Sequence, residues 1–94
     1  MELGEKAEHT LGRMDAASHS YPDIDLASHG AVEAGVSRRH AKITRVGEGR
    51  YYVMDLSSTN FTHVNGEQLD PFEPRVLADG DELHLGTLKL VFHQ

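Results

Sequence analysis

The chain has 94 residues, of which 38% are hydrophobic and 26% are charged, values typical of a small soluble domain with one hydrophobic core. It contains no cysteine, which excludes disulfides, thiol chemistry and cysteine-ligated metal sites. The formal net charge of −6 argues against nonspecific binding to nucleic acid, which needs a basic surface. No apolar run approaches membrane-spanning length and no signal peptide is visible, so we expect a cytoplasmic domain that does not bind membranes.

The first third of the chain predicts one short strand and a long loop. Residues 1–9 are polar and aperiodic, and we expect them to form an N-terminal segment or part of an edge strand before a single domain over residues 10–94. Residues 9–14 predict a short strand that ends at Gly12 and Arg13. Residues 15–35 have loop composition, with Pro22 and many small polar residues around a short apolar insert at Ile24 and Leu26.

The remaining two thirds predict short strands joined by tight turns. Residues 41–46 alternate between apolar and polar side chains, and residues 50–56 are rich in β-forming residues. Turn signals occur at 47–49, at Asn65-Gly66, at Asp79-Gly80 and at Gly86-Thr87. With almost no helix expected, this pattern predicts an all-β domain, an antiparallel sandwich or barrel.

Basic residues gather where one predicted loop enters a strand. Arg38, Arg39, Lys42 and Arg45 lie within eight positions of an otherwise acidic chain, which suits one discrete anionic group better than a polyanion. Ser37 offers a hydroxyl donor, Arg38 offers a planar set of donors for a doubly charged oxyanion, and Arg13 could supply a second cation. Pattern alone favours the plainer alternative, that Arg38 and Arg39 only solubilise a strand end.

The chain carries no recognisable catalytic or metal-binding motif. Its seven histidines lack the spacing of metal ligands, and His40, in an alternating strand, is expected to be a buried, hydrogen-bonded structural residue. No Gly-x-Ser-x-Gly elbow, phosphate-binding loop or dinucleotide fingerprint is present. We therefore predict a protein that is not an enzyme and needs no metal or cofactor.

Five short motifs in a fixed order resemble those of the forkhead-associated (FHA) domain. They are Gly12-Arg13, Ser37-Arg38-x-His40, Ser58-Thr59-Asn60, Val64-Asn65-Gly66 and Asp79-Gly80-Asp81 with Leu85-Gly86, and together they span residues 10–93. The resemblance implies an antiparallel β-sandwich of about eleven short strands whose loops at one end bind a phosphothreonine peptide. It also implies a bacterial signalling module whose partner is a Ser/Thr kinase or a kinase substrate.

The resemblance assigns roles to individual residues. Arg13 matches the arginine that reaches the peptide backbone and phosphate, Ser37 and Arg38 match phosphate contacts, Thr59 matches a residue that holds the phosphothreonine, and Asn60 matches one that bonds the peptide main chain. Support of the binding loops is expected from Gly12, His40, Phe61, Asn65 and Gly66. The alternative function is a structural interaction module that binds an unphosphorylated partner or self-associates through a sheet edge.

Two features depart from the family pattern. Phe61 replaces the usual glycine after Asn60, either as an anchor tucked under the binding loops or as a surface contact for the peptide, and we favour the anchor because an exposed Phe lowers solubility. Only eleven residues precede Gly12, so the first strand of the family is expected to be short or missing. A missing strand would expose a sheet edge, which leaves a dimer open although a monomer is expected.

Overall fold

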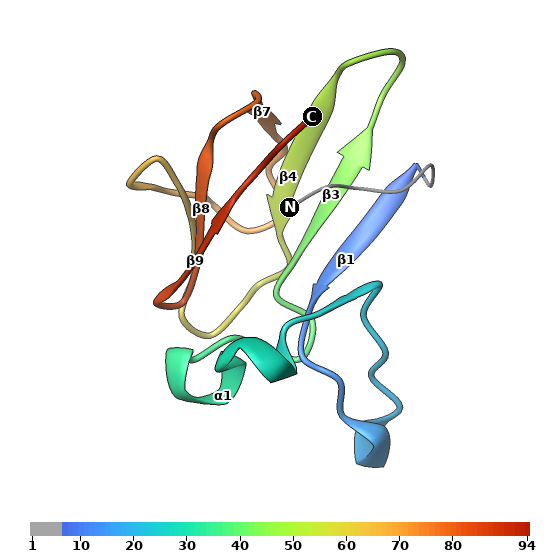
Figure 1. Ribbon diagram of the computed structural model, residues 1–94, viewed down its shortest axis with the longest axis vertical. Coiled ribbons are helices and arrows are strands. Elements are labelled where there is room, and N and C mark those ends of the chain that lie inside the picture. Colours follow the sequence, from blue (N-terminus) through green and yellow to red (C-terminus); the bar gives the residue numbers. More distant parts are fainter. Residues whose placement is uncertain (1–6) are drawn as a thin grey trace.

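The computed structural model describes residues 7–94, which form nine strands, one short α-helix and two 3-10 turns (Figure 1). In chain order the elements are β1 (Glu8–Gly12), η1 (Ala16–Ser18), β2 (Ile24–Asp25), η2 (Ala27–His29), α1 (Ala31–Ala34), β3 (Ala41–Arg45), β4 (Tyr51–Asp55), β5 (Thr62–Val64), β6 (Glu67–Gln68), β7 (Arg75–Leu77), β8 (Glu82–Leu85) and β9 (Leu88–Val91).

The strands build two sheets that face each other as a sandwich, which confirms the predicted fold class. The first sheet has the order β2-β1-β3-β4-β7 and the second has the order β6-β5-β8-β9. Pairing is antiparallel throughout except between β1 and β2, which run parallel over two residue pairs. The four turns predicted from sequence connect β3 to β4, β5 to β6, β7 to β8 and β8 to β9.

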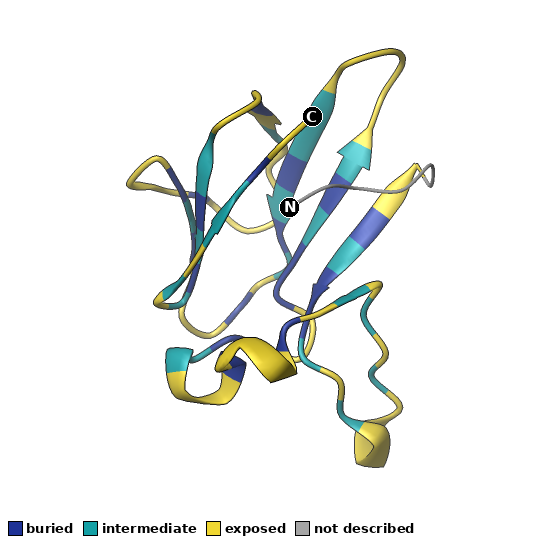
Figure 2. Ribbon diagram, in the orientation of Figure 1, coloured by how far each residue is buried: buried dark blue, intermediate teal, exposed yellow. Residues whose placement is uncertain are grey.

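The core lies between the two sheets, because alternate residues of each strand face inward. Figure 2 shows this alternation as buried residues separated by intermediate ones along β3 and β4. Leu11 and Ile43 lie on the first sheet, Leu83 lies on the second and Phe92 directly follows β9; all four are fully buried. The Phe92 ring meets Tyr51 edge to face at 5.1 Å between centroids, a favoured aromatic geometry.

Two expectations about the elements need correction. About eleven strands were expected, whereas residues 7–94 contain nine; the question of a further strand before β1 falls on residues 1–6, outside the described residues. Residues 15–35, expected to be loop, contain β2 and α1. The single turn of α1 is delimited by Gly30 and Gly35, both with φ near +77°, a left-handed conformation that glycine adopts without strain.

Loops from both sheets gather at one end of the sandwich, the lower end in Figure 1. Gly12, at the end of β1, makes this possible, since a Cβ there would lie only 2.0 Å from the Arg38 carbonyl oxygen. The same contact region holds the Arg13 N–H to the Arg38 carbonyl at 3.3 Å. Among residues 7–94 no helix is long and apolar enough to cross a membrane.

Candidate functional site

Two adjoining hollows open on the loop end of the sandwich. We call the first the serine–arginine hollow; it is lined by Ser18, Ser20, Ser37, Arg38, Arg39, Ser57 and Thr59. We call the second the valine–asparagine hollow; it is lined by Arg13, Val32, Gly35, Val36, Ser37, Thr59 and Asn60. Ser37 and Thr59 belong to both, so the five residues predicted to contact the peptide all lie around one continuous surface.

Ser37 connects the two loops that form this surface. Its Oγ accepts a hydrogen bond from the Thr59 N–H at 3.1 Å, and its own N–H donates to His40 Nδ1 at 3.0 Å. A hydroxyl can accept and donate at once. Within residues 7–94 the hydroxyl hydrogen has no acceptor assigned to it, so it is available to a ligand in either hollow.

His40 holds the loop that carries Ser37 at a fixed distance from the loop that carries Phe61. The ring is fully buried, and because Nδ1 accepts from Ser37, Nε2 carries the hydrogen and donates to the Phe61 carbonyl at 2.8 Å. Burial lowers the pKa of His40, partly opposed by the hydrogen bond to Phe61 and by the charge of Asp55. The neutral ring therefore joins the Ser37 loop to the Phe61 loop, as expected of a structural histidine.

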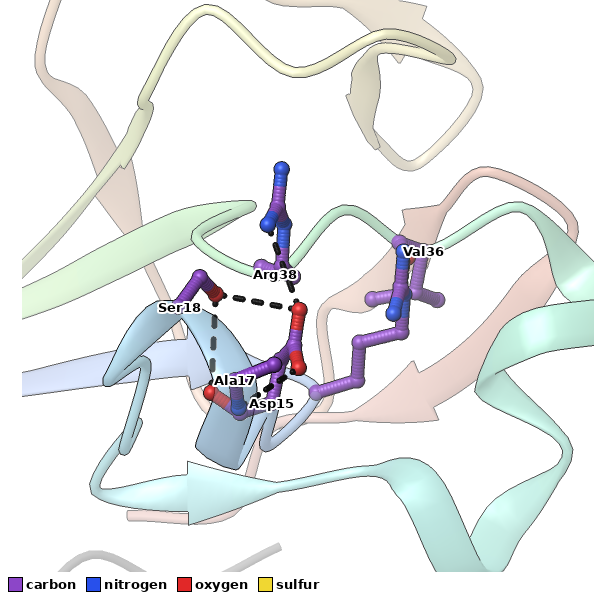
Figure 3. A network of polar contacts seen from close by, with 6 residues as sticks. Asp15, Ala17, Ser18, Val36 and Arg38 are labelled. Atoms are coloured by element: carbon purple, nitrogen blue, oxygen red, sulfur yellow. Dashed lines mark hydrogen bonds and ion pairs between the residues drawn. The ribbon is translucent and has the colours of Figure 1, made fainter.

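Arg38 is held over the serine–arginine hollow by an ion pair. Its guanidinium lies 3.2 Å from Asp15 Oδ2, with about half of the arginine side chain exposed. Figure 3 shows the Asp15 carboxylate between Arg38, the Ser18 hydroxyl and the Ala17 N–H. The hydrogen bonds from the Ser18 hydroxyl and the Arg38 guanidinium lower the pKa of Asp15, although its partial desolvation acts to raise that pKa. The aspartate thus orients the arginine while leaving much of it open to an anion.

Arg13 and Asn60 shape the valine–asparagine hollow. Arg13 Nε donates to the Val36 carbonyl at 2.9 Å, which directs the rest of the guanidinium toward the surface that it lines. Asn60 Nδ2 donates to the Gly35 carbonyl at 3.0 Å, and a Cβ on Gly35 would meet that same Nδ2 at 2.5 Å. Glycine is therefore required at position 35 both for this approach and for its φ of +77°.

Asp55 anchors the loop that carries Thr59 and Asn60. Its carboxylate is fully buried and accepts from the Ser58 N–H at 3.1 Å, from the Ser58 hydroxyl and from the Thr62 hydroxyl at 2.7 Å. Ser58 and Thr62 are themselves buried. Sequence inspection missed this residue, although an aspartate three residues before a serine is a known signal for a side-chain-capped turn.

The structure contradicts the preferred interpretation of Phe61. Its side chain is 44% exposed, so it is not tucked under the binding loops as an anchor, and its φ of +66° lies in the left-handed region that glycine would occupy without strain. Only its carbonyl supports the loops, by accepting from His40 and from the Gly86 N–H at 3.1 Å. This support comes from the backbone carbonyl, which a residue of any type at position 61 would supply.

Asn65 and Gly66 also lie elsewhere than expected. They form the turn after β5, whereas the binding loop precedes β5, so they occupy the far end of that strand. Asn65 bonds Asp81 and the Glu82 N–H, and the Ala78 N–H together with the Asn65 amide lowers the pKa of Asp81. These residues stabilise the opposite end of the sandwich and make no contact with the two hollows.

Several hollow-lining residues escaped the sequence analysis. They are Ser18, Ser20, Val32 and Ser57, and Asp15, which pairs with Arg38 beside the first hollow, escaped it too. Asp15 followed by Ser18 is a capping pattern, since Asp15 Oδ1 accepts from the Ala17 N–H at the start of η1, and that pattern could have flagged the segment. The others carry no local signal, because only the fold brings them to this surface.

The chemistry of the site is that of anion binding. Arg38 and Arg39 supply positive charge and the lining serines and Thr59 supply hydroxyl donors. Ser37 and His40 do not form a nucleophile–base pair, since His40 Nδ1 takes the Ser37 N–H and leaves the hydroxyl untouched. Within the described part of the chain no group of three His, Asp or Glu residues could hold a metal ion.

Comparison with known proteins identifies the family of this chain. The family model of the FHA domain matches residues 9–86. The chain is 47% identical over 86 residues to an oxoglutarate dehydrogenase inhibitor of Corynebacterium efficiens, covering 92% of this chain and 56% of that protein. It is 42% identical over 82 residues to the glycogen accumulation regulator GarA of Mycolicibacterium smegmatis, covering 87% of this chain and 48% of that protein. It thus spans about half the length of these relatives.

A solved structure shows the same arrangement in three dimensions. A domain described in work on phosphothreonine-dependent FHA domain interactions superposes with a TM-score of 0.74 at 29% identity, covering 96% of this chain and 79% of that one. The sequence match over residues 9–86 and the two-sheet sandwich agree. The chain belongs to the FHA domain family.

Proposed function

We propose that this domain binds a phosphothreonine-containing segment of a partner protein, with the phosphate in the serine–arginine hollow. The observation that carries the proposal is the convergence of Ser37, Arg38 and Thr59 on one hollow of an otherwise acidic chain. A phosphothreonine brings about −1.5 to −2 charges and three acceptor oxygens. The Ser37 hydroxyl and the Arg38 guanidinium offer donors that match those oxygens.

The neighbouring hollow suits the rest of the peptide. Asn60 uses its Nδ2 on Gly35, which leaves its amide oxygen to accept from a peptide N–H, and Arg13 lines the same hollow. Recognition centred on a phosphate with main-chain bonds beside it is a recurrent mode of peptide binding. An unphosphorylated partner is not favoured, because it would bring no anion to the exposed half of Arg38 or to Arg39 in the first hollow.

The whole protein would then act by phosphorylation-dependent association and not by catalysis. Its relatives are named as an inhibitor and as a regulator, and by analogy we propose that this domain holds a Ser/Thr kinase, or the substrate of one, in a bacterial regulatory complex. We expect it to work in the cytoplasm, as a monomer, without cofactor, nucleic acid or membrane.

Peptide titration tests the proposal. A phosphothreonine peptide library is titrated into the domain, with unphosphorylated and phosphoserine versions alongside, and binding is followed by fluorescence polarisation. We expect binding that requires phosphothreonine and that weakens roughly ten- to hundredfold in Arg38→Ala, the worth of one or two charge-assisted hydrogen bonds.

Arg75→Ala is the matched control. Arg75 forms an ion pair of almost the same length, 3.1 Å to Glu67, but it lies on β7, outside both hollows. Its loss should leave peptide affinity unchanged. Binding that ignores the phosphate, or that falls equally in both variants, would overturn the proposal.

A further inference from the structure

Phe61 does not itself line either hollow, but it is the next residue after Asn60, which lines the valine–asparagine hollow, and its backbone is fixed there. It follows Asn60, and its carbonyl accepts from His40 Nε2 at 2.8 Å and from the Gly86 N–H at 3.1 Å. The position of its Cα is therefore set by the residue that precedes β3 and by the turn between β8 and β9. The ring itself is 44% exposed.

Folding gives no reason for a phenylalanine at this position. Its φ of +66° disfavours every residue with a Cβ, and its exposed ring is not part of the core. A residue held in a disfavoured conformation next to a binding site is grounds for a functional hypothesis. Phe72 shares the positive φ and the exposure, so location, and not strain alone, is what distinguishes Phe61.

A second exposed apolar residue lies on the adjoining segment. Val32, on α1, is 68% exposed and lines the valine–asparagine hollow with Asn60. The two segments are joined by the Asn60–Gly35 hydrogen bond, and α1 is fixed from the other side by the Thr87 N–H, which donates to the Ala34 carbonyl at 2.9 Å. Two apolar side chains are thus presented by two immobilised segments that meet at the peptide site.

We propose that Val32 and Phe61 select the phosphopeptide by contacting an apolar side chain close to the phosphothreonine. This inference rests on the proposed function, because the occupant is the continuation of the peptide whose phosphate fills the serine–arginine hollow. The hollows share Ser37 and Thr59, so the peptide passes from one to the other without a break. Arg13 also lines this hollow and Glu33 is exposed on α1, so charges of both signs lie near it, and the selection that we propose is for an apolar side chain and not for a charge.

The test uses phosphothreonine peptides that are identical except at one flanking position, which carries Leu, Ser or Glu and is moved along the peptide. The wild-type domain should prefer Leu at one position by roughly tenfold over Ser, the discrimination that a modest apolar contact supplies. Phe61→Gly and Val32→Ser should each reduce that preference and still require the phosphate. Because glycine accepts a positive φ, Phe61→Gly should also retain its melting temperature, which separates lost selectivity from lost folding.

Phe72→Gly is the matched control, because it removes another exposed ring at a φ of +63° from the segment between β6 and β7, which contributes no residue to either hollow. It should keep the preference for Leu. Phosphate-dependent binding with no apolar preference, or a preference that survives Phe61→Gly or disappears equally in Phe72→Gly, would overturn this inference and leave the proposed function standing. Binding that does not depend on the phosphate would overturn both.

Discussion

His40 is the residue through which pH acts on the binding loops. Its neutral ring accepts from the Ser37 N–H and donates to the Phe61 carbonyl, and protonation would place a hydrogen on Nδ1 facing the Ser37 N–H. Burial accordingly lowers the pKa of His40 below its ordinary value of 6.5. The unfolded chain therefore takes up this proton at a higher pH than the folded chain does.

The expected consequence is a loss of stability in mild acid. As the pH falls below 6.5, protonation favours the unfolded state, and the free energy of unfolding decreases until the folded His40 is protonated too. The carboxyls with lowered pKa, such as Asp15 and Asp81, lose their contribution only as the pH falls below 3.8. Denaturant midpoints between pH 7.5 and 5 measure the effect, and NMR titration of the His40 ring, with the urea-unfolded chain as reference, assigns it. A folded-state midpoint at or above the reference value would contradict this account.

Among the elements, the loop between β4 and β5 depends on one buried carboxylate. Asp55 accepts three hydrogen bonds from Ser58 and Thr62. In Asp55→Asn an NH₂ group replaces one of the two carboxylate oxygens and cannot accept the hydrogen bonds that this oxygen accepts from Ser58 or Thr62. We expect the free energy of unfolding to fall by about 2–3 kcal/mol, the cost of losing hydrogen bonds to a buried charge, together with weaker binding of phosphopeptide.

Urea unfolding measures the first effect and peptide titration the second. Asp70→Asn is the control, because it makes the same change of charge at an exposed position and should leave both quantities nearly unchanged. Equal stability of the two variants would show that the hydrogen bonds of Asp55 do not hold the loop.

The elements also show what sequence can and cannot predict. Strands β3, β4, β8 and β9 follow from alternation and turn chemistry, which are local properties. The placement of Ser37, Arg38, Thr59 and Asn60 around one surface followed from the family motifs. The prediction that Phe61 is a buried anchor was wrong, because its exposure depends on which side of the 57–61 loop faces solvent. The prediction that Asn65 supports that loop was wrong, because β5 separates the loop from the turn that contains Asn65. Both are properties of the assembled sandwich that no short stretch encodes.

At the scale of the whole molecule, a positively charged site lies on a chain whose net charge is negative. The chain carries a net charge of −6, yet Arg38 and Arg39 line one hollow. The arginines act at contact distance on the phosphate, whereas the net charge acts over a Debye length, about 10 Å at 0.1 M salt and about 30 Å at 0.01 M. Residues of the peptide that extend beyond the site should therefore feel mainly the negative field.

This separation predicts how association depends on charges that never touch the site. Phosphothreonine peptides of identical central sequence, extended at both ends by Lys or by Glu, should differ in association rate, with the Lys-extended peptide several-fold faster at about 0.02 M salt. The difference should shrink toward none at about 0.5 M, where screening removes the long-range field but spares the close contacts with Arg38. Stopped-flow fluorescence measures both rates. A faster Glu-extended peptide would mean that the arginines, and not the net charge, dominate the field that an approaching peptide meets.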